Sequence, residues 1–407
     1  MSINRGLVFS AFPQVEGVSH FRLVFFVAVN LGPQSLSHCM RYERVCIESF
    51  GYTLPDEVVT SADLENRLAP LYERLRLPEG RLELMTGIRE RRFWPDGMPV
   101  GVQSVESADI AIERSGIDRG DFGALIHASV CRDHLEPATA CRVHHELGLS
   151  PDCLVYDVSN ACLGLLNGMV QLANMIELGQ ISAGVVVGTE SSQPVVERTI
   201  QTLNDRTDLT RSSIKPLIAT LTLGSASCAA VLCDRDLSAT CNRFAAVSAR
   251  AATEHHKLCR SGRDEAGPDM QPLMQTQSES LMMEGIATGA INFEKFLAES
   301  GWAREDLDKT FCHQVGSAHH RLMYERLGLT SDRDFTTFPW LGNTGAVALP
   351  ITMAIGADEG FLDAGDRVGM LGIGSGINCL MTAVEWQTAN IPLPSRNGRP
   401  VFAQMAT

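Results

Sequence analysis

Basic residues are scarce in this chain. Its 407 residues include 34 Lys and Arg against 48 Asp and Glu, which gives a formal net charge of −14. Because a surface that binds nucleic acid concentrates positive charge, we expect no nucleic acid among its main partners. Charged residues make up 20% of the chain and apolar residues 44%. Both values are close to globular averages, so extensive disorder is excluded.

Long hydrophobic runs are also absent. No apolar run approaches the ~20 residues that cross a bilayer. The early run Leu23–Val29 lacks the length, the basic start and the cleavage site of a secretory signal. We therefore expect a cytoplasmic protein without a membrane span.

No two cysteines have CxxC spacing, although the chain contains 12 of them. Six lie in apolar or alanine-rich runs, namely Cys46, Cys153, Cys228, Cys233, Cys312 and Cys379. This pattern favours reduced, buried thiols over a disulfide framework. Neighbouring histidines at 144–145, 255–256 and 319–320 lack the ligand spacing of a zinc site, so we expect no metal. We predict exposed helix faces for 144–145 and 319–320.

The chain changes character at Met40. Residues 1–39 have no sustained hydrophobic period, and we predict a poorly ordered extension that precedes the functional start. An ordinary flexible N-terminus is the alternative. From Met40 onward, apolar strands such as 124–130 and 184–188 alternate with helical stretches such as 163–178. This alternation is typical of an α/β fold with buried strands.

An internal repeat indicates how this α/β fold is organised. Residues 150–191 and 331–375 both contain a strand, a tight turn, a helix and a second apolar strand, in that order. Cys162 lies at the turn of the first passage and Asn343 at the turn of the second. We predict a duplicated fold whose halves meet around these turns. We predict an N-terminal half at 40–236, a C-terminal half at 237–390 and a tail at 391–407.

Cys162 and His313 are candidates for chemistry because of where they stand. A cysteine at the start of a helix lies near free N–H groups and the positive end of the dipole, which stabilise a thiolate. A buried structural thiol is the alternative for Cys162. His313 follows an apolar strand and precedes a helical segment, so it suits a neutral hydrogen-bond donor or base. On its own, a satisfied core histidine is the better interpretation.

Three further positions have two interpretations each. Asn343 sits between glycines, which suits a turn that points the amide into a pocket but also simple turn chemistry. Gly372–Gly376 suits close approach to a ligand or a bulged hairpin. Glu136, which precedes a proline and a helix start, suits a general base or a neighbour of the helix cap. Sequence alone favours the cap.

The order and context of these residues resemble a known family. The motifs that carry this resemblance are Thr86-Gly-Ile-Arg-Glu-Arg-Arg, Asp157-Val-Ser-Asn-Ala-Cys162, His313-Gln, Gly342-Asn-Thr-Gly and the glycine turn at 372–376. Across about 40–386 the chain resembles thiolase-superfamily condensing enzymes of the β-ketoacyl-acyl-carrier-protein synthase III branch. The resemblance implies a duplicated, five-layered αβαβα fold and a homodimer.

Within that branch, four segments are similar to OleA-type enzymes: 129–139, 221–224, 252–260 and 372–379. This likeness implies non-decarboxylative condensation of two fatty acyl-CoA molecules through an acyl thioester on Cys162. It also implies that acyl-CoA is a substrate and that no cofactor is needed. The N–H groups of Cys162 and Ser375 would form the oxyanion hole. His313 and Asn343 would bind the second thioester oxygen, and Glu136 would act as base in the neighbouring subunit.

Alternative functions remain open at the level of sequence. One is a decarboxylative synthase III that takes malonyl groups from an acyl carrier protein, and another is a non-catalytic chain-binding subunit. Acyl transfer to another acceptor, or thioester hydrolysis, leaves Asn343 without a role. Arg81 stands in the region where acetyl-CoA-using synthases carry a tryptophan, so we assign no CoA contacts. Candidates for a basic patch are Arg89, Arg91, Arg92 and Arg260, and candidates for pocket depth are Met282, Met283 and Phe293.

Overall fold

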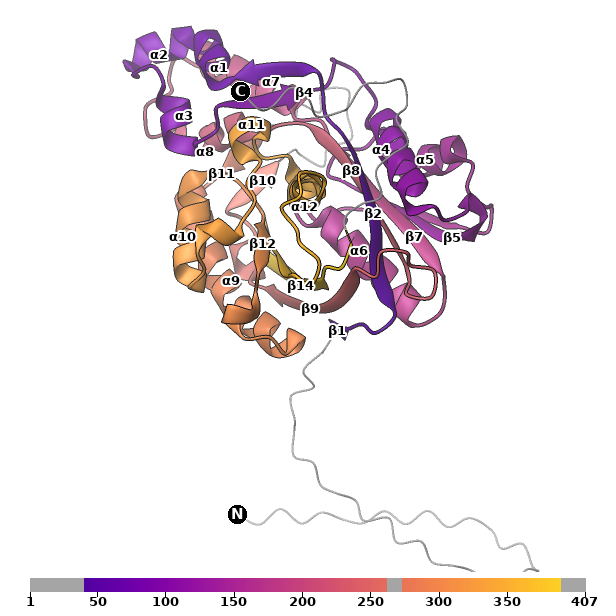
Figure 1. The fold of residues 1–407 in the computed structure, drawn as a ribbon. Coiled ribbons are helices and arrows are strands. Elements are labelled where there is room, and N and C mark those ends of the chain that lie inside the picture. The colour runs from indigo at the N-terminus through magenta and orange to yellow at the C-terminus, as the bar shows by residue number, and fades with distance from the viewer. Residues whose placement is uncertain (1–39, 262–272, 389–407) are drawn as a thin grey trace, which may run out of the picture. The chain divides into compact units, whose positions relative to one another are not determined.

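The computed structural model describes residues 40–261 and 273–388. The predicted extension 1–39 and the tail 391–407 lie outside the described residues. One large sheet dominates the fold (Figure 1). Its strands, in sheet order, are β12 (Lys309–Cys312), β13 (Arg367–Gly374), β14 (Asn378–Glu385), β9 (Arg243–Ala251), β2 (Val45–Thr53), β8 (Ala226–Asp234), β7 (Ala183–Glu190), β5 (Phe122–Ala128) and β6 (Leu154–Val158); β1 (Met40–Arg41) pairs with β9.

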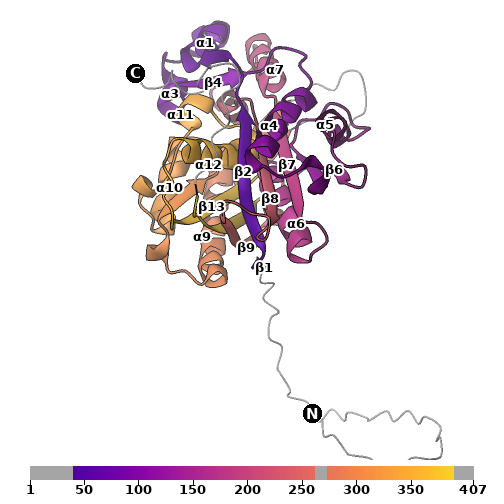
Figure 2. The same cartoon turned by 45° about the vertical axis from the view of Figure 1, so that its right-hand side comes forward.

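The sheet repeats one pattern on either side of its centre. From β2 outward, β2 pairs antiparallel with β8 and β8 pairs antiparallel with β7. Strand β7 then pairs parallel with β5, and β5 pairs parallel with β6. From β9 outward, β14 and β13 pair antiparallel and β12 then pairs parallel. The two series join where Cys46 pairs with Arg243. Figure 2 shows β2 and β8 side by side, with β2 next to the join.

Helices lie between and outside the two halves of the sheet. The inner helices are α6 (Gly164–Glu177) and α12 (Ala348–Asp358), which contact strands of the surrounding sheet. Outside are α4 (Val100–Ser115) and α5 (Thr139–Leu147) on the N-terminal half, and α9 (Ser278–Ser300) and α10 (Ser317–Leu327) on the C-terminal half. This arrangement confirms the expected thiolase-like, duplicated αβαβα fold.

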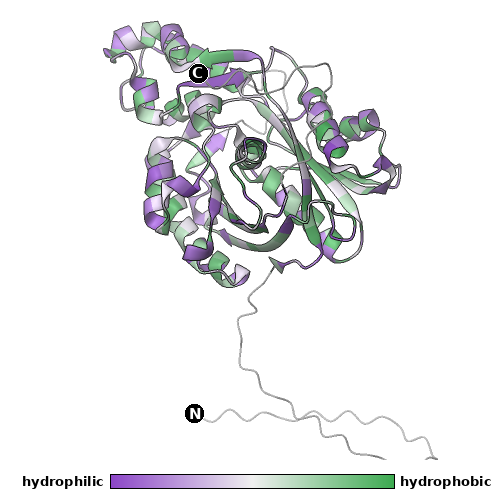
Figure 3. Ribbon diagram, in the orientation of Figure 1, coloured by the Kyte–Doolittle hydropathy of each residue, from purple (hydrophilic) through white to green (hydrophobic). Residues whose placement is uncertain are grey.

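The inner helices follow from their composition. Every residue of α12 from Ala348 to Ala357 is buried, and its one hydroxyl there, on Thr352, donates to the carbonyl of Ala348 at 2.7 Å. A helix that is apolar on all sides must be enclosed, because no face of it gains from water. Figure 3 shows hydrophobic residues concentrated in the strands and the inner helices.

Smaller elements cover one end of this framework. The helices are α1 (Ser61–Arg67), α2 (Ala69–Leu75), α3 (Arg81–Thr86), α7 (Gln193–Asp205), α8 (Lys215–Ile218) and α11 (Phe338–Leu341). The strand pairs are β3 (Glu57–Thr60) with β4 (Glu90–Phe93), and β10 (Cys259–Ser261) with β11 (Met274–Thr276). Short 3₁₀ turns include η2 (Ala219–Thr222), η5 (Ser331–Arg333) and η6 (Gly345–Val347). None of the described helices is long and apolar enough to cross a membrane.

The repeat is less complete than the sequence suggests. A first strand was expected near residue 331, but the structure has η5 there and a single parallel bridge between Thr310 and Asp334. The segment Asp332-Arg333-Asp334 has no apolar alternation that would support a longer ladder. The C-terminal half therefore lacks a full counterpart of β6.

Other sequence predictions are corrected by burial. Arg91 is fully buried, and its guanidinium donates to the carbonyls of Val59 and Leu221, so it is no candidate for a basic patch. Of the candidates for pocket depth, Phe293 lies in the core of the C-terminal half and Met283 is exposed. In contrast, the cysteine prediction is confirmed, because the six named thiols are all buried and every described cysteine is free.

Candidate active site

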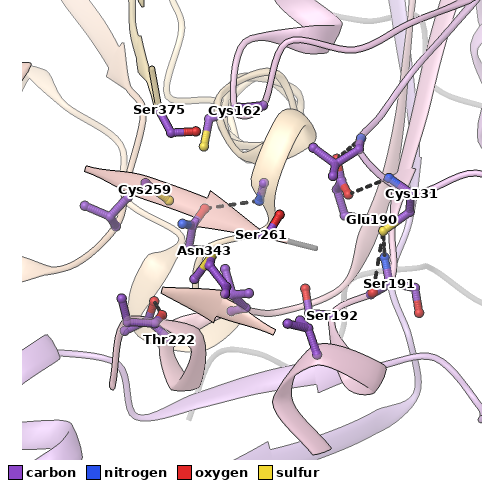
Figure 4. A pocket seen from close by; sticks show the side chains of 18 of the residues that line it. Cys131, Cys162, Glu190, Ser191, Ser192, Thr222, Cys259, Ser261, Asn343 and Ser375 are labelled. Atoms are coloured by element: carbon purple, nitrogen blue, oxygen red, sulfur yellow. Dashed lines mark hydrogen bonds between the residues drawn. The ribbon is translucent and has the colours of Figure 1, made fainter. Parts of the chain in front are cut away.

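Both halves contribute to a cavity of about 1010 Å³. Cys162 and Glu190 line it from the N-terminal half, and His313, Asn343 and Ser375 line it from the C-terminal half. Figure 4 shows Cys162 beside Ser375, with Asn343 and Glu190 on the surrounding wall. Four of the five side chains or amides predicted from sequence thus reach one cavity. Glu136 is the exception.

Cys162 stands on a turn between β6 and α6. Ala161, directly before it, has a φ of 45°, a left-handed conformation that costs free energy in a residue other than glycine. Helix α6 begins two residues after the thiol, at Gly164. The predicted strand, turn and helix around Cys162 are therefore present.

The resting thiol is not the thiolate that the helix start predicted. Burial, together with the nearby Cys259 and Glu190, raises the pKa of Cys162 to about 12, although the backbone N–H groups of Ser375 and Cys162 itself oppose this. Desolvation of the charged form exceeds what two amides restore. Cys162 is therefore a neutral thiol at physiological pH. The two amides that oppose this rise are the pair expected for the oxyanion hole.

His313 follows the last residue of β12, and its backbone N–H donates to the carbonyl of Leu371 at 3.1 Å. Its side chain is only 4% exposed, and neither ring nitrogen has a hydrogen-bond partner among the described residues. Burial, followed by the neighbouring His319, lowers the pKa of His313 to about 3. The imidazole is consequently neutral and can donate one N–H to a carbonyl oxygen in the cavity.

Asn343 is held in place through its backbone and its side-chain oxygen. Its N–H donates to Thr222 and its carbonyl accepts from Gly224, at 2.8 and 3.0 Å. Its Oδ1 accepts from the N–H of Gly345 at 3.1 Å, which leaves Nδ2 as the end that can donate to a ligand. A Cβ on Gly342, whose φ is 66°, would lie 2.6 Å from the carbonyl oxygen of Thr222. Only glycine fits before this asparagine.

Glu136 is exposed on the loop between β5 and α5 and does not line the cavity of its own chain. The cap interpretation of this residue is wrong. The first two amides of α5, those of Thr139 and Ala140, donate to the carboxylate of Asp157 instead, both at 2.9 Å. Because a strand residue already occupies the helix N-terminus, Glu136 is left for another role.

Glu190 and His319 also line this cavity, although neither was a sequence candidate for the site. Glu190 ends the apolar strand β7, and a carboxylate at the end of a buried strand was the available signal. His319 was expected on an exposed helix face, but it lines the cavity and its Nδ1 is buried. Its neighbour His320 is also mostly buried and pairs with Asp334, with Nε2 and Oδ2 2.7 Å apart. The exposed face of α10 lies elsewhere because this pair holds the helix against η5.

Fold and cavity together define a thiolase-superfamily condensing enzyme, which is an acyltransferase. The thiolase N-terminal domain model matches residues 104–267, and the 3-oxoacyl-[acyl-carrier-protein] synthase III C-terminal model matches residues 297–386. A Shewanella oneidensis protein named acyl-CoA:acyl-CoA alkyltransferase is 44% identical over 351 residues, which cover 85% of this chain and 100% of that protein. The chain belongs to this alkyltransferase family.

Two further relatives show how this chain compares with OleA and with synthase III enzymes. A crystal structure of a cysteine-to-serine variant of Xanthomonas campestris OleA, with bound lauric acid and lauroyl-CoA, has a TM-score of 0.79 at 34% identity. The match covers 85% of this chain and 100% of that chain. β-Ketoacyl-[acyl-carrier-protein] synthase III 1 of Bacillus cereus is more distant, at 26% identity over 350 residues that cover 84% of this chain and 99% of that protein.

Proposed function

We propose that this enzyme joins two fatty acyl-CoA molecules by a non-decarboxylative Claisen condensation. The observation that carries the proposal is the single cavity that receives a thiol, a neutral imidazole, an asparagine amide and two backbone N–H groups. A nucleophile and two separate sets of oxygen-binding donors suit a reaction with an acyl-enzyme and an enolate. The bound lauroyl-CoA of the OleA structure supports acyl-CoA as the substrate class.

In the first half-reaction, Cys162 attacks the carbonyl carbon of an acyl-CoA. The C–S bond to CoA breaks, the new thioester forms on Cys162, and the thiol proton leaves with CoA. The N–H groups of Cys162 and Ser375 stabilise the oxyanion of the tetrahedral intermediate. Because the resting thiol is neutral, this step begins without an ionised nucleophile and depends on these donors.

In the second half-reaction, a base removes an α-proton from another acyl-CoA. No CO₂ is lost to generate the carbanion, so a carboxylate is needed, and Glu136 of the partner subunit is our candidate. His313 and Asn343 donate to the enolate oxygen. The carbanion attacks the acyl group on Cys162 and expels the thiolate, which recovers the proton from Glu136 of the partner subunit. The product is a 2-alkyl-3-ketoacyl-CoA.

A homodimer is part of this proposal. Strand β6 is an edge of the sheet, and its first residue, Leu154, is 52% exposed. The large hydrophobic side chains of Val130 and Leu135, on the loop after β5, are also exposed. An apolar edge strand is a ready surface for a second copy. Pairing there would bring the loop that carries Glu136 toward the partner. The free described cysteines support a reducing, cytoplasmic compartment.

The test is product analysis with one saturated fatty acyl-CoA and no malonyl group. We expect release of CoA thiol and a β-keto product that contains two acyl chains. A strict requirement for malonyl-carrier protein would favour the decarboxylative alternative and overturn the proposal. Release of free fatty acid alone would indicate a thioesterase.

A further inference from the structure

Glu190 is a buried carboxylate in the wall of the cavity, with 4% of its surface exposed. Both of its oxygens accept backbone N–H groups. Oε1 accepts from Val130 at 3.0 Å and from Ala346 at 3.3 Å, and Oε2 accepts from Cys131 at 3.4 Å. These amides belong to two segments that are far apart in sequence. Glu190 therefore connects two loops at the cavity (Figure 4).

The first of these segments is the turn that carries Asn343. Within it, the N–H of Gly345 orients the Asn343 side chain, and the next N–H, that of Ala346, donates to Glu190. The contact is close, because a Cβ on Gly345 would lie 3.0 Å from Cγ of Glu190. The carboxylate thus supports the turn at the residue after the one that fixes the amide.

The second segment is the loop 130–138, on which Glu136 lies. Its first two residues donate to Glu190, and Cys131 also exchanges contacts with Ser191, whose N–H lies 3.4 Å from the sulfur. Further along, Asp133 accepts from the N–H of Gly101 at 2.9 Å. Glu136 follows these anchors. Glu190 therefore fixes the start of this loop, and Asp133 fixes it nearer to Glu136.

We propose that Glu190 is a positioning residue for condensation: it holds the Asn343 turn of its own site and the loop that presents Glu136 to the partner subunit. The inference rests on the function proposed above. It adds the residue that positions Asn343 and Glu136, the two groups that act in the second half-reaction. A carboxylate suits this role because both oxygens accept. A glutamine keeps the shape but replaces one acceptor with an NH₂ group that faces a backbone N–H.

Glu190 should affect the two half-reactions differently. Burial raises the pKa of Glu190 itself, whereas the N–H groups of Val130 and Ala346 favour its charged form. In that form its negative charge raises the pKa of the Cys162 thiol. For formation of the acyl-enzyme this charge is a disadvantage, because it opposes ionisation of the nucleophile. A residue retained only for packing would change both half-reactions in proportion to the amount of folded protein. A positioning residue for the enolate and its base would change the second alone.

The test compares Glu190→Gln with wild-type full-length protein on one saturated acyl-CoA. We expect covalent acylation of Cys162 to stay within about twofold, while β-keto product formation falls about 10- to 100-fold, the size of effect that small misplacements cause. Alkylation of the resting thiol by iodoacetamide at pH 8 should become faster. Equal product formation in both proteins, or equal losses in both half-reactions, would overturn the inference.

Glu48→Gln is the matched control. Glu48 is 1% exposed and likewise accepts from the N–H groups of a loop, at Ala239 and Thr240, but it does not line the cavity. We expect this variant to leave the ratio of acylation to condensation unchanged. If the wild type itself forms no product from acyl-CoA, the proposed function is wrong. If the wild type forms product and Glu190→Gln forms it equally well, the proposed function stands and only the inference about Glu190 is wrong.

A second variant covers the case in which Glu190→Gln does not fold. Glu190→Asp keeps the charge but shortens the reach, so it should show the same selective loss of condensation. Combining the folded variant with Asn343→Ala adds a further check. If Glu190 acts partly through Asn343, the double variant loses less than the product of the two single losses. Fully multiplicative losses in condensation would contradict the Asn343 arm of the proposal.

Discussion

The two halves of the molecule place different side chains at equivalent turns. In the N-terminal half, β6 leads through Ala161 to Cys162 and then into α6. In the C-terminal half, the bridge at Asp334 leads through Gly342 to Asn343 and then into η6 and α12. One turn carries a thiol and the other an amide that can donate a hydrogen bond. The duplicated fold thus brings two turns with different side chains to one cavity, and the proposed function gives each turn its own step.

The halves also differ at their outer edges. The N-terminal series ends in β6, a five-residue strand whose side chains are at least partly exposed. The C-terminal series ends in a single bridge at Asp334, which pairs with His320 from α10. The first edge is open to a second copy, whereas His320 and Asp334 cover the second with a side-chain contact of their own. The proposed dimer would therefore form through the N-terminal half.

The largest expected effect on product formation comes from removing the thiol of the N-terminal turn. Cys162→Ala should reduce product formation at least about 10³-fold, as loss of a covalent nucleophile does. It should also abolish covalent labelling by a radiolabelled acyl-CoA. Cys259→Ala is the control, because this thiol lines the same cavity, and it should stay within about threefold of wild type. Labelling that persists in Cys162→Ala would contradict the assignment.

Removing the amide of the other turn should affect only the second step. Asn343→Ala should lower β-keto product formation about 10²- to 10³-fold, the size of loss seen when one donor to an oxyanion is removed. Acylation of Cys162, measured by the same label, should remain near the wild-type level. A matching loss of acylation would show that the two turns do not divide the reaction as proposed.

The stability of the two turns should respond to a different extent when glycine and alanine are exchanged. Gly342→Ala should lower the free energy of unfolding by about 2–3 kcal/mol, because it combines a positive φ with a clash at Thr222. Ala161→Gly relieves a positive φ and should change it by less than about 1 kcal/mol. Urea unfolding of both variants measures the difference. Equal losses would refute it.

The sequence was sufficient to predict the features that depend on hydrophobic periodicity and on the order of residues along the chain. The strand and helix around Cys162, the matching turn at Asn343 and the duplicated fold follow from apolar runs and their spacing, and these survive in the structure. Glu190 and His319 were missed because their importance depends on which distant loops pack against them. The state of Cys162 was predicted wrongly for a related reason. A helix start is visible in sequence, whereas the desolvation that outweighs it arises only from tertiary burial.

Both halves contain buried histidines with lowered pKa values, and these give the smallest expected effect, a change in the pH dependence of stability. Burial lowers the pKa of His313 to about 3 and that of His319 to about 4 in the C-terminal half. In the N-terminal half, burial lowers the pKa of His127 to about 4, although the nearby Asp157 opposes this. Each imidazole is neutral when folded and ordinarily titrates near 6.5 when exposed.

The sign of the pH effect follows from these values. Between the folded and unfolded pKa, the unfolded state binds more protons, so lowering the pH from 6.5 favours unfolding by up to about 1.4 kcal/mol per histidine and pH unit. Carboxylates also titrate in this range, so the difference between variants is the useful quantity.

His319→Gln should lose up to about 2 kcal/mol less stability than wild type between pH 7 and pH 5. Urea unfolding at both pH values measures this difference. His145→Gln, at an exposed site on α5, should show the full wild-type loss. If His319→Gln shows that loss too, the side chain does not pass from a buried, neutral state to a solvated one on unfolding.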